Sequence, residues 1–194
     1  MSEQTVTRRG IALDELIERS AQGKFELIDG ELHAMSPSTL AHSILIKKLL
    51  FALSAVAADR WEVFSETTFI APEQAASNWL TDSLVPDILI FDKAAFEALR
   101  ADKTLATTRP AALIPALVAE ILSPADRQSD VSRKVQRYLT LGVRLIWIID
   151  PQVQQVTVYR HGSKHASLLS AADTLAADDL LPAFALPLDQ FFAL

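Results

Sequence analysis

The spacing of apolar and polar residues in the first third of the chain predicts a helix, a hairpin and a second helix. Residues 12–21 place apolar side chains at helical spacing, which predicts a short amphipathic helix. Two strand-like runs, 25–28 and 31–35, flank Asp29-Gly30, a pair that readily adopts the positive φ angles of a tight hairpin turn. Residues 40–58 again carry apolar side chains at helical intervals, so we expect the first long helix there.

The middle of the chain indicates buried strands separated by surface segments. Residues 61–70 are rich in β-branched and aromatic side chains, which predicts a strand, and residues 71–83 have the composition of a loop. Two short, nearly continuous apolar runs, 85–91 and 116–122, are typical of strands buried on both faces. Between them, residues 94–105 are expected to form a short helix or a surface excursion.

The last third of the chain predicts one more long helix with strands after it. Ser123-Pro124 has the composition of an N-cap and first turn for a helix over 125–141, which Gly142 ends. Residues 143–149 then predict a buried strand, and the alternating run 155–159 could pair back on it as a hairpin.

The C-terminal tail and the order of elements define the expected fold class. Residues after His161 suggest loop and short strand, and we expect the apolar pair Phe191-Phe192 to dock on the core. With no internal repeat and no long linker, residues 1–194 are expected to form a single α/β domain with a mixed β-sheet.

Composition narrows the chemistry that the chain can perform. Half of its 194 residues are hydrophobic and only 22% are charged, which is typical of a globular protein. The sequence has no cysteine, so a disulfide framework, an iron–sulfur cluster, a zinc–thiolate site and a cysteine nucleophile are all excluded. Any metal ion must therefore be bound by oxygen or imidazole ligands.

The sequence offers no membrane or export signal. Residues 1–10 are polar and carry no apolar stretch, so we expect no signal peptide and a cytoplasmic protein. The longest uncharged apolar stretches, Leu49–Ala58 and Pro110–Ala119, are each ten residues long, well below the roughly 20 residues needed to cross a bilayer.

The distribution of charge is uneven. The net charge of −6 argues against tight, nonspecific binding of nucleic acid. Residues 126–144 nevertheless contain five basic side chains and only two acidic ones. We expect this basic segment to be where a phosphate backbone approaches.

Two carboxylates interrupt the buried strands, Asp87 in the first and Glu120 in the second. Burying an ionised carboxylate costs several kcal/mol unless it is paired or bound to a metal. Mg²⁺ or Mn²⁺ would compensate both, because hard divalent cations take oxygen ligands. Alternatively, each carboxylate lies at a strand end in solvent or pairs with an arginine.

Lys134 places a charge on the apolar side of the helix over 125–141. The apolar stripe of that helix is formed by Val131, Val135, Tyr138 and Leu139, and Lys134 lies on the same side. Its stem could cover apolar surface while the ammonium reaches water. Alternatively, the ammonium lies beside the two carboxylates and could stabilise charge on a phosphate or hold an attacking water.

These residues carry a resemblance to a known family. The chain resembles the bacterial family of putative restriction endonucleases, a branch of the PD-(D/E)XK nuclease superfamily, in the motifs Glu26-Leu27-Ile28-Asp29-Gly30-Glu31-Leu32, His42, Val85-Pro86-Asp87, Val118-Ala119-Glu120-Ile121-Leu122-Ser123-Pro124, Asp126-Arg127, Lys134, Tyr138, Gly142-Val143, Trp147-Ile148-Ile149-Asp150-Pro151 and Val156-Thr157-Val158-Tyr159-Arg160. These motifs span nearly the whole chain.

The resemblance implies a fold, a reaction and a set of site residues. It implies a restriction-endonuclease-like mixed sheet flanked by helices, and Mg²⁺-dependent hydrolysis of DNA, with Asp87 and Glu120 as metal ligands. The chain departs from the superfamily pattern after Glu120, where Ile121 and Leu122 follow and the expected strand lysine is missing. Lys134 would have to bring its ammonium into the same space.

The resemblance also adds two candidate catalytic residues and an assembly. The resembled family has a glutamate and a histidine at the positions of Glu31 and His42, which makes both candidates. Glu31 could approach the metal site or be an exposed strand residue, and His42 could be a packing residue instead. Because cutting both strands of a duplex needs two sites related by a two-fold axis, we expect a homodimer.

Two other functions use the same residues. A glycoside hydrolase would also need two carboxylates, but its cleft is typically lined by exposed aromatic residues, and only 7% of this chain is aromatic. A nuclease fold that has lost activity and serves as a binding or assembly module would explain the missing strand lysine simply.

Overall fold

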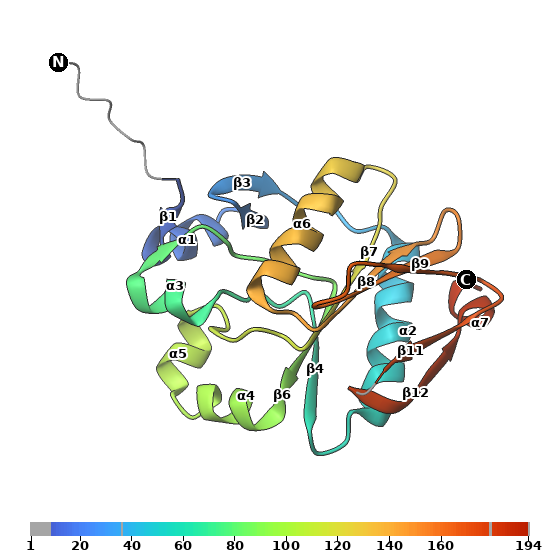
Figure 1. Cartoon of the computed structure of the whole chain (residues 1–194). Coiled ribbons are helices and arrows are strands. Elements are labelled where there is room, and N and C mark those ends of the chain that lie inside the picture. Colours follow the sequence, from blue (N-terminus) through green and yellow to red (C-terminus); the bar gives the residue numbers. More distant parts are fainter. Residues whose placement is uncertain (1–8, 36, 179, 194) are drawn as a thin grey trace.

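A six-stranded mixed sheet lies at the centre of the computed structural model, which describes residues 9–35, 37–178 and 180–193 (Figure 1). Residues 1–8, on which much of the expectation about the N-terminus rests, lie outside the described residues. Strands β7 and β8 are parallel, and the other neighbouring pairs are antiparallel. The order across the sheet is β10 (Ser167–Ser170), β9 (Gln155–Arg160), β8 (Leu145–Asp150), β7 (Leu117–Ile121), β6 (Ile88–Asp92) and β4 (Trp61–Ser65). The predicted α/β fold with a mixed sheet is confirmed.

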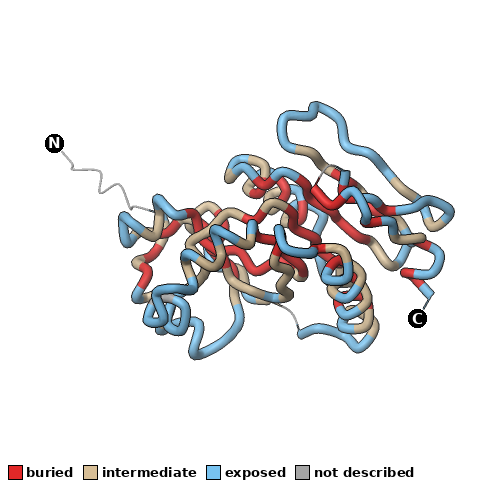
Figure 2. Tube along the Cα trace, turned by 90° about the horizontal axis from the view of Figure 1, so that it is seen from below, coloured by how far each residue is buried: buried red, intermediate tan, exposed pale blue. Residues whose placement is uncertain are grey.

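Side chains alternate between the two faces of this sheet, and each face has its own cover. Figure 2 shows the buried residues gathered in the middle of the molecule. On one face, Ala119 and Trp147 pack with α2 (Leu40–Ala57) and with the C-terminal elements β11 (Thr174–Ala177), β12 (Leu181–Pro187) and α7 (Leu188–Phe192). On the other face, Val118 and Ile146 pack against α6 (Gln128–Leu141). Phe191 and Phe192 are buried in the first of these cores, as predicted.

The N-terminal elements form a smaller unit beside the sheet. They are β1 (Ile11–Ala12), α1 (Leu13–Ser20) and the hairpin of β2 (Phe25–Ile28) and β3 (Glu31–Ala34). The predicted turn is confirmed, because Asp29 and Gly30 have φ angles of 51° and 78°. Leu27 and Ser83 exchange two backbone hydrogen bonds of 2.9 Å, which ties the hairpin to the segment just before β6.

Several boundaries differ from the sequence prediction. Strand β4 ends at Ser65 rather than at residue 70, since Glu66 adopts a positive φ of 47°. The segment 71–83 contains short elements that its composition did not predict, α3 (Pro72–Ser77) and β5 (Trp79–Leu80), and β5 is formed by pairing with β1. The segment after β6 forms two helices, α4 (Lys93–Arg100) and α5 (Lys103–Thr108).

Two shifted boundaries affect the residues of interest. Helix α6 begins at Gln128 rather than at residue 125, because the Asp126 carboxylate accepts the backbone N–H of Ser123 at 2.7 Å and closes a separate turn. Asp87 lies directly before β6 rather than within a strand. The Asp87 side chain is therefore presented at the end of the strand.

Helix α2 (Leu40–Ala57) begins at the edge of the sheet and crosses one face. The Thr39 hydroxyl accepts the backbone N–H of His42 at 3.2 Å and caps its first turn. Among the described residues it is the one helix that has the length and composition of a membrane span, a test that core helices also pass. Its Leu45, Leu49 and Leu53 are buried against the sheet.

The core of the first face generates a stability prediction. Trp147 is fully buried and stacks on Phe184 with ring centroids 5.5 Å apart. Trp147→Ala should lower the free energy of unfolding by about 3–5 kcal/mol, because it leaves a large cavity between β8 and β12. Phe51→Ala is the control, since Phe51 is 62% exposed and should change stability by less than about 0.5 kcal/mol. Urea unfolding measures both, and equal losses would contradict this account of the core.

Candidate active site

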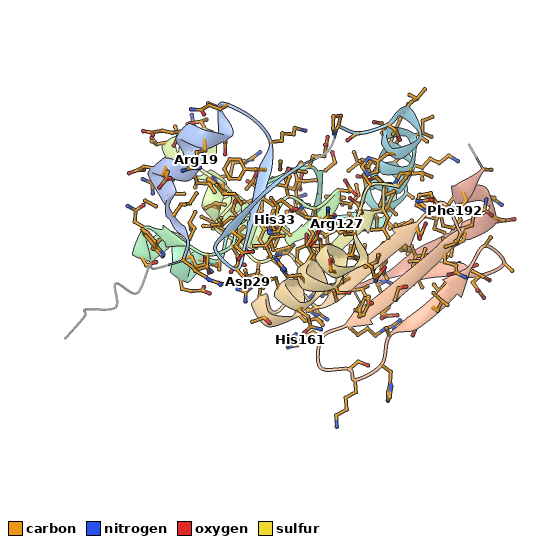
Figure 3. All side chains as sticks on the ribbon, turned by 90° about the horizontal axis from the view of Figure 1, so that it is seen from above. Arg19, Asp29, His33, Arg127, His161 and Phe192 are labelled. Atoms are coloured by element: carbon orange, nitrogen blue, oxygen red, sulfur yellow. The ribbon has the colours of Figure 1, made fainter. Side chains whose placement is uncertain are left out.

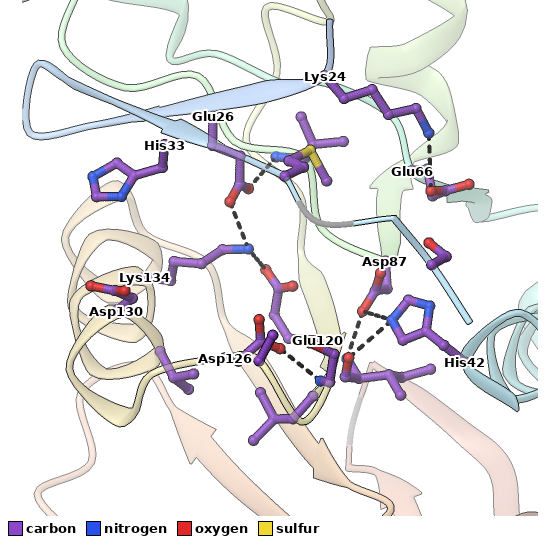
Figure 4. Close-up of a pocket in the computed structure, with 18 of the residues that line it drawn as sticks. Lys24, Glu26, His33, His42, Glu66, Asp87, Glu120, Asp126, Asp130 and Lys134 are labelled. Carbon is purple, nitrogen blue, oxygen red and sulfur yellow. Dashed lines mark hydrogen bonds and ion pairs between the residues drawn. The ribbon is translucent and has the colours of Figure 1, made fainter.

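A cleft of about 740 Å³ opens where the hairpin, the start of α2, the end of β7 and the start of α6 meet (Figure 4). The structure brings four of the five predicted catalytic residues to this cleft. The polar side chains that line it are Lys24, Glu26, His33, Ser38, Thr39, His42, Ser43, Glu66, Asp87, Glu120, Ser123, Asp126, Arg127, Asp130 and Lys134. The cleft therefore combines residues from distant parts of the chain.

Asp87 is held by two donors on one of its oxygens. Its Oδ2 accepts the backbone N–H of Ile121 at 2.6 Å and lies 3.2 Å from His42 Nε2. The same His42 nitrogen lies 3.0 Å from the carbonyl oxygen of Ile121, which can only accept, so Nε2 carries a proton. The hydrogen bond to Asp87 raises the pKa of His42, although burial opposes the rise. His42 thus orients the Asp87 carboxylate.

Glu120 and Lys134 meet because of two regular periodicities. Strand alternation turns Glu120 toward the α6 face, and Lys134 and Tyr138 lie one helical turn apart on the inner side of α6. Lys134 Nζ lies 2.6 Å from Glu120 Oε1, and the Tyr138 hydroxyl donates to the same oxygen. The structure thus places the Lys134 ammonium beside Glu120.

Glu26 belongs to the site and was not among the predicted catalytic residues. It is buried, its Oε1 accepts the backbone N–H of Val85 at 2.8 Å, and its Oε2 lies 3.0 Å from Lys134 Nζ. The Lys134 ammonium is thus shared between Glu26 and Glu120, as the dashed lines in Figure 4 show. The sequence signal that could have identified Glu26 is its place on the same side of β2 as the buried Ile28.

Charge balance in the cleft determines the protonation of these groups. The pKa of Glu120 is raised to about 7 as the net result of several effects: burial raises it most, Lys134 lowers it, and the negative charges of Glu26 and Asp87 raise it. Burial also lowers the pKa of Lys134, but Glu120 and Glu26 more than offset this and raise it above its usual value. Lys134 therefore stays charged. The positive charge near Glu120 does not fully compensate its negative charge.

Glu31 is not at the site, which corrects the sequence prediction. Its side chain is 52% exposed and lies 3.3 Å from Arg133 and 3.8 Å from Arg9. Glu31 directly follows the hairpin turn, where β3 projects over the outer surface of α6, while Glu26 lies nearer the open end of the hairpin. The acidic residue that the hairpin contributes to the cleft is Glu26.

Asp87 and Glu120 are the two predicted metal ligands among the carboxylates that line the cleft. Among the described residues, no group of three or more histidine and acidic side chains is placed to bind a metal ion. Within this part of the chain, Asp87 Oδ1 and Glu120 Oε2 accept no hydrogen bond, while the other oxygen of each carboxylate is held by protein donors. Each carboxylate thus keeps one oxygen available to a ligand.

The comparison with protein families identifies the chain. The family model described as Uma2, putative restriction endonuclease, matches residues 12–189. The chain belongs to the Uma2 family. All of the cleft residues described above lie within the matched range.

A solved structure supports the same assignment of the fold. The crystal structure of a putative nuclease belonging to DUF820 from Anabaena variabilis superimposes with a TM-score of 0.76 at 22% sequence identity. The match covers 94% of this Uma2 chain and 97% of the other chain. The search of curated proteins found no match. The family supports a nuclease, and the structural match supports the fold.

The raised pKa of Glu120 generates a stability prediction for the metal-free protein. The folded-state pKa is about 7 and the usual value is 4.5, so ionising Glu120 lowers the free energy of unfolding as the pH rises from 4.5 to 7. Glu120→Gln removes this penalty and should be more stable than the unmodified protein at pH 8 by about 1–3 kcal/mol. At pH 5 the difference should be small.

The measurement is urea unfolding in EDTA at both pH values. Glu18→Gln, on the exposed side of α1, is the matched control and should show no such pH-dependent gain. A Glu120→Gln protein that loses stability relative to the unmodified protein between pH 5 and pH 8 would contradict the charge balance described here.

Proposed function

We propose that this protein is a divalent-metal-dependent endonuclease that hydrolyses phosphodiester bonds of DNA. The observation that carries the proposal is the paired arrangement of Asp87 and Glu120. Each carboxylate has one oxygen held by protein donors and one without a hydrogen bond in the described structure, and the two side chains line the same cleft.

The donor set fits Mg²⁺, with Mn²⁺ as a substitute. Mg²⁺ is usually bound by one or two carboxylates together with water and substrate phosphate oxygens. Glu26, Asp87 and Glu120 are three of the six carboxylates that line this cleft, and Lys134 offsets only part of the charge of these three. When bound by Asp87 and Glu120, the ion would lower the pKa of a water molecule and offset charge on the reacting phosphate.

The side chains of the chain itself supply the remaining roles. The Lys134 ammonium can donate a hydrogen bond to a phosphate oxygen or hold the attacking water, because it stays charged between two carboxylates. Glu26 positions Lys134, Tyr138 positions Glu120, and His42 positions Asp87. Each reactive group is thus fixed by a second side chain.

The position of Lys134 favours an active enzyme over an inactive nuclease fold. The alternative of a binding or assembly module rested on the missing strand lysine. An ammonium 2.6 Å from Glu120 offers the same charge from α6 instead. No aromatic side chain lines the cleft among the described residues, which argues against a glycoside-binding site.

The proposal predicts the effect of removing single groups. Asp87→Asn, Glu120→Gln and Lys134→Met should each lower Mg²⁺-dependent cleavage of circular DNA by about 100-fold or more, because each removes charge stabilisation at the phosphate. Asp14→Asn and Lys164→Met, at exposed positions, are the matched controls. Cleavage is followed on gels with duplex and single-stranded circles, and circular dichroism confirms folding.

Either of two results would contradict the proposal. One is unmodified protein that cuts neither kind of circle with Mg²⁺ or Mn²⁺. The other is full activity in the Asp87 and Glu120 variants, which would place the reaction elsewhere.

A further inference from the structure

The basic segment predicted to meet a phosphate backbone is largely neutralised within the protein. Arg133 pairs with Glu31 at 3.3 Å, and Lys134 is held by Glu26 and Glu120. Arg137 Nε donates to the buried Asp82 at 2.8 Å, and its guanidinium also lies 3.2 Å from Asp29. These three side chains are therefore engaged with carboxylates and do not form a basic track for DNA.

Two cations at the cleft remain available to a ligand. Arg127 is exposed at the N-cap of α6, lines the cleft, and forms no ion pair with any residue in the described part of the chain. Lys24 pairs with Glu66 at 3.2 Å, but its side chain is 70% exposed. Such exposed pairs contribute little to stability, so Lys24 can exchange Glu66 for a phosphate.

These two cations come from different walls of the cleft. Lys24 directly precedes β2 and reaches toward Glu66 on the Asp87 side, as Figure 4 shows. Arg127 stands at the start of α6, and its side chain is labelled in Figure 3. A strand that crosses the carboxylates from one wall to the other would meet one cation before them and one after them.

The shape of the cleft is also too restricted for a duplex. Its volume of about 740 Å³ lies in the range of pockets that take one small ligand, roughly 300–1,000 Å³. The side chains of Asp87 and Glu120 are only 13% and 12% exposed, so the reacting groups lie deep between the hairpin and α6. Specific duplex sites, in contrast, bury about 1,000–2,500 Å² of protein surface and use many basic side chains.

The lining offers little for reading bases. The apolar part of the lining consists of aliphatic side chains such as Met35, Pro37, Leu122 and Ala125, and no described residue of the lining is Phe, Tyr or Trp. In other single-strand sites, stacking of bases on aromatic rings supplies much of the affinity. Binding here therefore depends on the phosphates, with little preference for sequence.

We propose that the substrate of this cleft is an unpaired DNA strand, held through about two phosphates by Lys24 and Arg127 on either side of the bond that is cut. The cleavage step rests on the function proposed above: the oxygen of water bonds to phosphorus, one P–O ester bond breaks, and the departing oxygen takes a proton. The products are one terminal phosphate and one hydroxyl end. A single cleft suffices for an unpaired strand, so this reaction does not require the homodimer expected for double-strand cleavage.

The first test measures binding without requiring cleavage. A fluorescein-labelled 12-nucleotide strand of mixed sequence and its blunt duplex are titrated with protein in Ca²⁺, another cation with oxygen ligands, between 50 and 200 mM salt. Fluorescence anisotropy gives the affinity, and a gel checks that the strands are intact. We expect the single strand to bind at least tenfold more tightly than the duplex.

The salt dependence counts the phosphates. Two phosphate contacts on a single strand predict a slope of log K against log salt of about −1.4, since each contributes about −0.7. Arg127→Ala and Lys24→Ala should each bring the slope to about −0.7, while Lys164→Ala, at a remote exposed lysine, should leave it unchanged. A slope of −4 or steeper, equal binding of the duplex, or no binding of either probe would overturn the proposal.

The second test separates this inference from the proposed function. With Mg²⁺, single-stranded circles should be cut with at least tenfold higher kcat/KM than relaxed closed duplex circles. Relaxed duplex cut as fast as the single strand would overturn the unpaired-strand proposal and leave the nuclease intact. Failure to cut either circle would instead refute the nuclease itself.

Discussion

The site depends on one ammonium group that is shared by two buried carboxylates. Lys134 reaches Glu26 on the hairpin and Glu120 on the central sheet, so a single side chain of α6 joins three elements that are distant in sequence. Removing either carboxylate would leave Lys134 paired with the other, whereas removing the lysine would leave two negative charges facing each other. The ion pair that completes the chemistry therefore also determines how closely the hairpin and α6 approach.

The remaining groups of the cleft follow the same arrangement. Asp87 accepts hydrogen bonds from the backbone N–H of Ile121 and from the His42 imidazole, and the Tyr138 hydroxyl donates one to Glu120. Glu120 is left with too little positive charge around it. Such strain is typical of functional sites, where stability is exchanged for a prepared arrangement of charge.

Much of the fold could be predicted from the sequence because its signals are local. The Asp29-Gly30 turn, the apolar periodicity of α2 and the continuous apolar runs of β7 and β8 are set by residues close to one another in the chain. The inward placement of Lys134 also follows from helical spacing alone. What these local patterns cannot show is which partner lies across the space that a side chain enters.

The errors in predicting the site arose because local patterns do not show which side chains meet. Glu26 and Glu31 lie on the same hairpin, and only the position of α6 above it decides that Glu26 enters the cleft. The basic segment looked available because its partners, Asp82 and Glu31, come from other parts of the chain. The Ser123-Pro124 cap signal does not begin α6, because the Asp126 side chain accepts the backbone N–H of Ser123 and closes a separate turn there.

The buried Asp82 has a mechanical consequence for the cleft. It accepts a hydrogen bond from Arg137 on α6 and from the backbone N–H of Asp29 in the hairpin turn, so the turn is fastened to α6. At the opposite end of the hairpin, beyond the buried Glu26, Lys24 forms an exposed ion pair with Glu66. The hairpin is therefore held less firmly at Lys24 than at its turn. We expect the cleft to widen first at Lys24, beside α2.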